Sequence, residues 1–209
     1  MTESQQSLAC LLTLIMLVFA PSTASSNPFK KLEQQILDSE GITLAFEIRS
    51  EGAVKSTLVG RLALCQGNRI MIQSSGVLFG QPVKNSLQSD GLVMNLNRQQ
   101  QILPPKLNEA VVVGLLRMGL LHNLARLGGN LAPDHAGGGV ADWVQVPVVR
   151  VNSDNLYFDI LVAGARAGRA ELILSDDGLP LTRVQKVYFG SEEMNVTESY
   201  TDFSLSCRL

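Results

Sequence analysis

Residues that could act as acid, base or nucleophile are few in this chain. Of the two histidines, His122 stands in a long apolar stretch, and His135 follows Asp134 in a loop rich in glycine. An Asp-His pair could perform acid–base catalysis, but adjacent side chains rarely orient each other, and no cysteine or second histidine stands near them in the sequence. We therefore expect His122 to pack in the core, and we expect no catalytic group.

Metal binding would require several His, Cys or carboxylate ligands that converge on one point. Acidic residues cluster only at Asp176-Asp177 and Glu192-Glu193, where turns and solvent-exposed strand ends are expected. The chain also lacks the glycine-rich phosphate-binding motifs and the GxSxG nucleophile motif. We expect no metal site and no cofactor, and we do not expect an enzyme.

Cys65 and Cys207 are the two cysteines outside the N-terminal apolar segment. Each stands in a segment with strand character, one early in the chain and one at its C-terminal end. In an oxidising compartment such a pair can form a disulfide, which here would tie the last strand to the sheet. Two buried free thiols are the alternative.

The N-terminal segment predicts export from the cytoplasm. Residues 8–20 are apolar apart from Thr13, and Ser22-Thr23-Ala24 follows with the small residues of a cleavage site. A membrane-spanning helix needs about 20 apolar residues, so this run is short for an uncleaved anchor, which is the alternative. We predict a signal peptide over residues 1–24, one domain over residues 25–209, and a periplasmic location.

The balance of charge argues against a nucleic-acid partner. The chain has 17 Lys and Arg against 19 Asp and Glu, and it contains no run of basic residues. Neither the whole molecule nor any segment would therefore attract a phosphate backbone. We expect no binding to nucleic acid.

Two periodicities divide the rest of the chain into elements. Asn27-Pro28 is a typical helix start, and apolar residues then recur at helical spacing until shortly before Gly41. From Ile42 onward apolar and polar residues alternate, with a turn predicted at residues 50–52, which is typical of strands with one buried face. Strands resume after residue 142, so we expect about nine or ten antiparallel strands.

Residues 108–127 interrupt the alternation and predict the only long helix. This segment is apolar nearly all round, so it must be enclosed by the sheet or plug it. Leu115, Leu116 and Met118 are the residues we expect to cover the sheet, and the glycine-rich residues 128–139 would be the hinge. The sequence leaves open whether the helix is a movable lid or fixed core.

The elements together predict an α+β fold, in which a curved antiparallel sheet forms an incomplete β-barrel. An N-terminal helix and the mid-chain helix would cover or plug it. A sheet of about ten strands encloses more volume than its own side chains fill, so an apolar cavity is expected. The predicted inward-facing residues are Leu44, Phe46, Ile48, Leu58, Leu62, Leu64, Leu92, Met94, Leu96, Leu156, Phe158 and Ile160.

Short motifs follow one another in a characteristic order along the chain. They are GRLAL at residues 60–64, NRIMI at 68–72, SDG at 89–91, DGLP at 177–180, VQKVYF at 184–189 and YTDF at 200–203. In this order, and over most of residues 28–206, the chain resembles the periplasmic outer-membrane lipoprotein carrier family, the LolA/LolB-like superfamily. Family members usually have an Arg-Pro pair after the second strand, whose arginine helps to close the cavity, whereas this chain has Gln66-Gly67.

The resemblance implies a periplasmic carrier that holds the acyl chains of a lipid or lipoprotein in an apolar half-barrel cavity. A membrane-protein donor and a membrane-protein acceptor would then be transient partners. Two alternatives stay open. One is an envelope interaction or structural protein without a ligand, and the other is a small enzyme on the same scaffold, with Asp134 or His135 at the barrel mouth.

Overall fold

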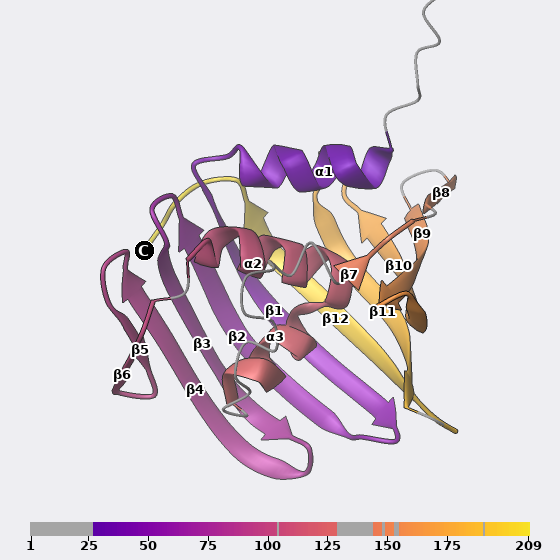
Figure 1. The fold of residues 1–209 in the computed structure, drawn as a ribbon, viewed down its shortest axis with the longest axis horizontal. Helices are drawn as coiled ribbons and strands as arrows, with labels where there is room; N and C mark the ends of the chain where they lie inside the picture. Colours follow the sequence, from indigo (N-terminus) through magenta and orange to yellow (C-terminus); the bar gives the residue numbers. More distant parts are fainter. Residues whose placement is uncertain (1–26, 104, 129–143, 148, 153–154, 190) are drawn as a thin grey trace, which may run out of the picture.

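A computed structural model of the chain describes residues 27–103, 105–128, 144–147, 149–152, 155–189 and 191–209 (Figure 1). The helical elements are α1 (Pro28–Leu37), α2 (Leu107–Val113), the π-helical turn η1 (Gly114–Met118) and α3 (Leu120–Gly128). The strands are β1 (Gly41–Gly52), β2 (Ser56–Cys65), β3 (Arg69–Leu78), β4 (Gln81–Asp90), β5 (Met94–Leu96), β6 (Gln99–Gln101), β7 (Val144–Gln145), β8 (Val149–Asn152), β9 (Asn155–Val162), β10 (Ala165–Leu174), β11 (Pro180–Phe189) and β12 (Glu192–Ser204).

All twelve strands belong to one antiparallel sheet. Their order is β6-β5-β4-β3-β2-β1-β12-β11-β10-β9-β7, and β8 pairs with β9. Among the described residues the end strands β6 and β7 do not pair with each other, so the sheet is not closed into a barrel. This confirms the predicted α+β fold with an incomplete barrel. The described chain has more strands than the nine or ten expected, partly because β7 and β8 are separate short strands.

The two halves of the chain meet in the middle of the sheet. The first half supplies a meander from β1 to β6, and the second half supplies the strands that end with β12. The last strand pairs with the first along nearly its whole length, from Thr43↔Ser204 to Gly52↔Met194. Because this pairing continues to Gly52, β1 extends through the turn predicted at residues 50–52, and the chain reverses after it.

Helix α1 begins as the sequence predicts. The side chain of Asn27 accepts a hydrogen bond from the N–H group of Phe29 at 3.0 Å, and Pro28 occupies the first turn. The helix buries Phe29, Leu32 and Ile36 on one face, and it lies across one end of the strands (Figure 1). Among the described residues no helix is long and apolar enough to cross a membrane.

The mid-chain segment differs from the single helix predicted over residues 108–127. It contains α2, η1 and α3, and the chain breaks at Gly119, where φ is 88° and ψ is 160°. We call residues 107–128 the helical cover, because they lie over the concave face of the sheet (Figure 1). The predicted mid-chain helix is therefore present, but it is divided at Gly119 instead of running continuously.

Leu92 is a second correction, because it is 85% exposed rather than facing inward. The turn after β4 is longer than the sequence suggests. The carboxylate of Asp90 accepts hydrogen bonds from the N–H groups of Leu92 and Val93, at 2.8 and 2.9 Å. These bonds keep both residues in the turn, and β5 begins only at Met94.

Candidate functional site

The residues predicted to line a cavity lie on the concave face of the sheet, in the main apolar cluster. Nine of them are at most 7% exposed, and Leu96 at the sheet edge is half-buried. The nine are Leu44, Phe46, Ile48, Leu58, Leu62, Leu64, Met94, Phe158 and Ile160. The structure thus brings residues from both halves of the sheet onto one apolar surface.

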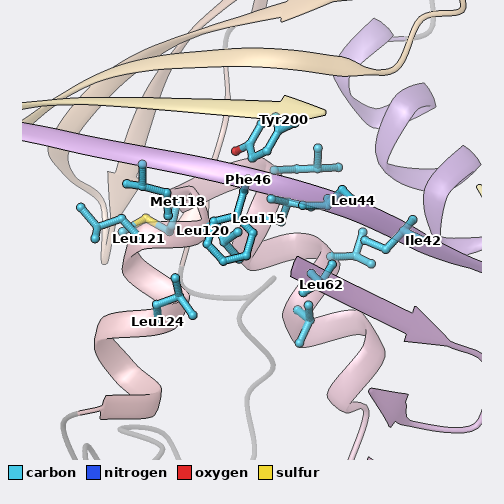
Figure 2. Close-up of a cluster of buried hydrophobic side chains, with 14 of the residues drawn as sticks. Ile42, Leu44, Phe46, Leu62, Leu115, Met118, Leu120, Leu121, Leu124 and Tyr200 are labelled. Atoms are coloured by element: carbon cyan, nitrogen blue, oxygen red, sulfur yellow. The ribbon is translucent and has the colours of Figure 1, made fainter. Parts of the chain in front are cut away.

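The helical cover packs directly against this surface. Its buried side chains in η1 and α3 are Leu115, Leu116, Met118, Leu120, Leu121 and Leu124, and α2 adds Leu107, Val111, Val112 and Val113. Figure 2 shows several of them gathered beneath β1 around the ring of Phe46, close to Leu44 and Leu62. The interior described here is therefore a packed contact between cover and sheet.

Two pockets lined by described residues lie outside that contact. One has a volume of about 30 Å³ and lies at the corner between α1, α2, β1 and β2, with Ile36, Ile42, Leu64 and Val112 in its wall. The other, about 570 Å³, is an open hollow on the polar side of α1 beside Lys30 and Lys31. The first holds a few water molecules at most, and neither is an acyl-sized cavity under the cover.

A buried carboxylate on the sheet begins the second half of the cover. Glu198, in the middle of β12, is 1% exposed. Its two oxygens accept hydrogen bonds from the N–H groups of Leu120 and Leu121, at 2.7 and 2.8 Å. The first N–H groups of a helix have no partner within it and carry partial positive charge, so a carboxylate is favourable there. Glu198 is thus the N-terminal cap of α3.

A buried arginine ends the first half in the complementary way. Arg183 on β11 is paired with Glu198 across the strands and is 0% exposed. Its guanidinium donates to the carbonyl oxygens of Leu116 and Arg117, at 2.6 and 2.9 Å. Its Nε atom donates to the Gln185 side chain at 2.7 Å. A cation at the carbonyl end of a helix is favourable, so the two charges match the two helix ends.

Gly119 separates these two ends, and the space there excludes a side chain. A Cβ atom on Gly119 would lie 2.7 Å from the Glu198 carboxylate and 3.1 Å from Nε of Arg183. Its φ of 88° is also unfavourable for any residue other than glycine. The buried charges of the sheet therefore fix the point at which the cover breaks.

Tyr200 completes this polar cluster, because its hydroxyl donates to the Glu198 carboxylate. Burial and the neighbouring Glu198 charge raise the pKa of Tyr200 well above its usual 10.0. Burial also lowers the pKa of Arg183, while the charges of Tyr200 and Glu198 act in the opposite direction. At neutral pH Tyr200 is therefore a neutral donor to Glu198.

A second polar contact holds the cover from its other side. Arg117 on η1 forms a two-point ion pair with Glu33 on α1, with N–O distances of 2.8 and 2.6 Å. It also donates to the carbonyl oxygen of Val144 on β7 at 2.8 Å. The pair is mostly buried, so salt screens it less than an exposed pair. The cover is thus held by side chains of α1, β11 and β12.

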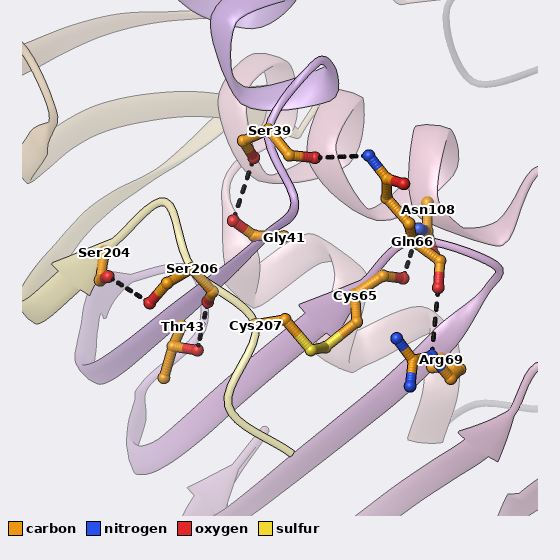
Figure 3. The surroundings of a disulfide bond; sticks show 10 residues. All are labelled: Ser39, Gly41, Thr43, Cys65, Gln66, Arg69, Asn108, Ser204, Ser206 and Cys207. Atoms are coloured by element: carbon orange, nitrogen blue, oxygen red, sulfur yellow. Dashed lines mark hydrogen bonds between the residues drawn. A yellow bond between two sulfur atoms is a disulfide. The ribbon is translucent and has the colours of Figure 1, made fainter.

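Gln66 and Gly67, which stand where the resembled family has its Arg-Pro pair, lie in the turn after β2. The Gln66 side chain donates to the carbonyl oxygen of Ser39 at 3.2 Å (Figure 3). That contact joins the turn to the end of α1. Asn68 in the same turn reaches the cover, because its side chain accepts a hydrogen bond from the N–H group of Asn108 at 3.2 Å. No arginine stands in this turn, and the arginine that contacts the cover from the sheet is Arg183.

Cys65 and Cys207 form a disulfide in the structure, with the Cα atoms 5.2 Å apart. The bond joins the end of β2 to the C-terminal segment after β12 (Figure 3). Asn108, at the start of the cover, donates from its side chain to the carbonyl oxygen of Cys65 at 2.6 Å. The disulfide is therefore next to the point where the cover leaves the sheet.

The side chains considered for catalysis are not brought together in the described part of the chain. His122 lies half-buried on α3, while Asp134 and His135 lie outside the described residues, as does most of the expected hinge at 128–139. No group of three or more His, Cys, Asp or Glu that could hold a metal ion occurs among the described residues.

Sequence reasoning missed the Arg183–Glu198 cluster, although a signal for it was present. On β11 and β12 the inward positions alternate, and Arg183, Gln185, Glu198 and Tyr200 occupy them beside apolar residues. A charged residue at an inward-facing position of a strand needs hydrogen-bond partners in the interior. That pattern could have pointed to a polar contact with the mid-chain helix.

No family model matches the chain, and no curated protein sequence is significantly similar to it. Similar solved structures include a LolA superfamily protein from Nitrosomonas europaea, at 12% identity and a TM-score of 0.37, which covers 87% of this chain and 93% of that one. Another is the complex of MucA and MucB from Pseudomonas aeruginosa, at 12% identity and a TM-score of 0.35. The match covers 85% of this chain and 55% of that chain, so this chain spans about half of its length.

A DUF1329 family protein from Desulfovibrio piger is also similar, at 7% identity and a TM-score of 0.30, over 84% of this chain and 90% of that one. The structures found thus include a member of the superfamily that the sequence resembles.

Proposed function

We propose that the protein is a carrier of the bacterial envelope that binds acyl chains of a lipid or lipoprotein between the concave sheet face and the helical cover. One observation carries the proposal. A helical segment that is apolar nearly all round lies inside an unclosed sheet, and the hydrogen bonds that hold it there come from a few side chains. Such a segment can leave and return without breaking the backbone hydrogen bonds of the sheet, which a strand in the sheet could not do.

The energetics of this exchange favour opening only when a ligand is present. Lifting the cover exposes apolar surface on both partners, which is unfavourable by about 25 cal/mol for each Å². An acyl chain on the same surface restores part of the burial, at about 0.8 kcal/mol for each buried CH₂ group. The closed form described here is therefore the state expected without ligand, and the cover acts as a lid.

Gly119 is the hinge that we propose for this lid. The residues on both sides of it are held by Arg183 and Glu198, so a rotation at Gly119 changes those polar contacts first. Residues 128–139, which the sequence suggested as the hinge, would then connect the lid to β7.

An envelope location is consistent with two features of the chain. The predicted signal peptide over residues 1–24 would export the protein, and a Cys65–Cys207 disulfide is stable in an oxidising compartment. A lipid or an acylated lipoprotein would be the cargo, and membrane proteins that deliver or receive it would be transient partners. The near-neutral charge of the chain gives no attraction for nucleic acid.

The proposal is tested by uptake of a pyrene-labelled dodecanoyl methyl ester, followed by fluorescence. Leu96→Asp places a charge at the half-buried edge of the concave face, so we expect weaker uptake with the fold retained. Val59→Asp is the matched control, because Val59 is 50% exposed on the outer face of β2. Equal uptake by both variants and the wild type would count against the concave face as the site.

The filled interior favours one second candidate, an envelope interaction or structural protein without a ligand. In that case the cover would be fixed core, and no probe would enter the molecule. Absence of uptake by the wild-type protein, with the fold intact, would move the conclusion to this candidate. No geometry among the described residues favours an enzyme.

A further inference from the structure

Two polar residues lie side by side on the apolar concave face, midway along two neighbouring strands. Ser74 on β3 and Asn85 on β4 are directly opposite each other in the antiparallel register. They are 4% and 8% exposed. The next inward pair in one direction is Ile72 with Leu87, so the two form a polar spot on an apolar surface.

The hydroxyl of Ser74 and the amide nitrogen of Asn85 are buried without a hydrogen-bond partner. Three buried serines of the first four strands differ in this respect. Ser50 on β1 donates to the carbonyl oxygen of Val54, Ser56 on β2 accepts from Phe79, and Ser89 on β4 accepts from Gly91, all at 3.0–3.2 Å. Those three hydroxyls bond to backbone groups near the strand ends, while Ser74 and Asn85 lie midway along their strands.

Unsatisfied buried polar groups are rare because each is destabilising, and an apolar side chain of the same shape would be better there. Because Ser74 and Asn85 are neighbours, one polar group of a ligand could form hydrogen bonds with both side chains. Such a ligand would enter when the proposed lid opens.

We infer that Ser74 and Asn85 form a polar subsite that binds the ester or amide carbonyl at the head of an acyl chain. Both side chains can donate a hydrogen bond, and a carbonyl oxygen accepts two. The cations next to the pair in the register, Lys84 and Arg61, are exposed and alternate to the outer face, so a carboxylate would enter this surface without a partner for its charge. The subsite therefore selects an uncharged acyl carbonyl.

In the neighbouring row of the sheet an aromatic ring fills the space beside this pair. Gly60 on β2 stands opposite Ser74, and Phe46 on β1 stands opposite Gly60. The Phe46 ring occupies the space above Gly60, where a Cβ atom would lie 2.4 Å from it. An acyl chain that displaces the lid would meet this ring and continue along the apolar rows on either side. The inference rests on the proposed carrier function and adds the polarity of its ligand.

Two pyrene-labelled probes of equal chain length test the subsite, a dodecanoyl methyl ester and the corresponding alkane. The wild type is expected to prefer the ester. Asn85→Leu and Ser74→Ala are expected to weaken ester binding about tenfold, the value of one net hydrogen bond, and to leave alkane binding unchanged or tighter. Without ligand, both variants should melt a few degrees higher than the wild type, because an orphaned polar group has been removed.

Ser56→Ala is the matched control, since it removes an inward hydroxyl that already has a partner. It should melt lower and keep the ester preference. Equal weakening of both probes by Asn85→Leu, or an unchanged ester preference in both variants, would overturn the subsite while leaving the carrier function in place. Binding of neither probe by the wild type would overturn both.

Discussion

Two charged side chains are buried between strands and helices, and hydrogen bonds account for their presence there. Burying a charge is costly unless it is paired or hydrogen-bonded, and here both charges meet unsatisfied backbone groups at a break in a helix. Glu198 meets N–H groups and Arg183 meets carbonyl groups. The break in the cover and the two charges therefore stabilise each other, which explains why Glu198 and Arg183 are charged residues in an otherwise apolar interior.

Glu198→Gln tests this dependence. The amide oxygen of glutamine can take the place of only one of the two carboxylate oxygens, so one buried N–H group of Leu120 or Leu121 loses its acceptor. We expect a loss of about 2 kcal/mol in the free energy of unfolding, measured with urea, because a buried donor left without a partner typically costs about 1–3 kcal/mol. Glu47→Gln, at a solvent-exposed pair with Arg49, should change stability by less than about 1 kcal/mol. Similar losses in both variants would contradict the account.

Tyr200→Phe tests the polar cluster through its pH dependence. Burial and Glu198 raise the pKa of Tyr200 in the folded state, whereas the unfolded chain titrates near 10. Below pH 10 both states hold the proton, and above it the unfolded state loses its proton first. The wild type should therefore lose stability above pH 10 by about 1.4 kcal/mol for each pH unit relative to Tyr200→Phe, measured by urea unfolding between pH 8 and about 11. Parallel pH profiles would show that Tyr200 is not buried as described.

At the scale of elements, alternation of apolar and polar residues predicted most strands and their inward faces. Ile42, Leu44, Phe46 and Ile48 face inward because the sheet is covered on one side only. The alternation could not predict the break of the cover, because Gly119 is one residue in an otherwise helical pattern. The break depends on Glu198, which is 78 residues away from Leu120 in the sequence and adjacent only in the fold.

Gly119→Ala should destabilise the closed cover by two effects. An alanine is strained at φ 88°, and its Cβ atom would meet the Glu198 carboxylate and Arg183. Gly67→Ala is the matched control, because Gly67 also has a positive φ, 76°, but open space around it. We expect about 1 kcal/mol for Gly67→Ala and about 2–3 kcal/mol for Gly119→Ala in urea unfolding. Equal losses would mean that the contact with the two charges does not matter.

At the scale of the whole molecule, the disulfide joins the end of β2 to the chain terminus across a sequence separation of 142 residues. Closing a loop of that length removes much of the entropy of the unfolded chain, which the chain-entropy model values at about 5 kcal/mol. Reduction should therefore lower the midpoint of thermal unfolding strongly, with the thiols counted in the same samples. An unchanged midpoint after full reduction would contradict this contribution.

The fold could be predicted further than the candidate site. The class of fold follows from periodicities that act over a few residues, and the apolar cover follows from its composition. By contrast, Ser74 and Asn85 look like ordinary strand residues in the sequence, and only the strand register shows that they lie opposite each other. Likewise, nothing local in the sequence shows that Arg117 meets Glu33, because the two are 84 residues apart.

Native mass spectrometry of the protein purified from the cell envelope, followed by solvent extraction, tests the central claim most directly. The carrier account predicts a bound acyl lipid or acylated peptide in about one copy per chain, whose extraction identifies the cargo. A ligand-free mass, together with no uptake of the pyrene-labelled methyl ester by the folded protein, would contradict it and leave an envelope interaction protein with a permanently closed interior.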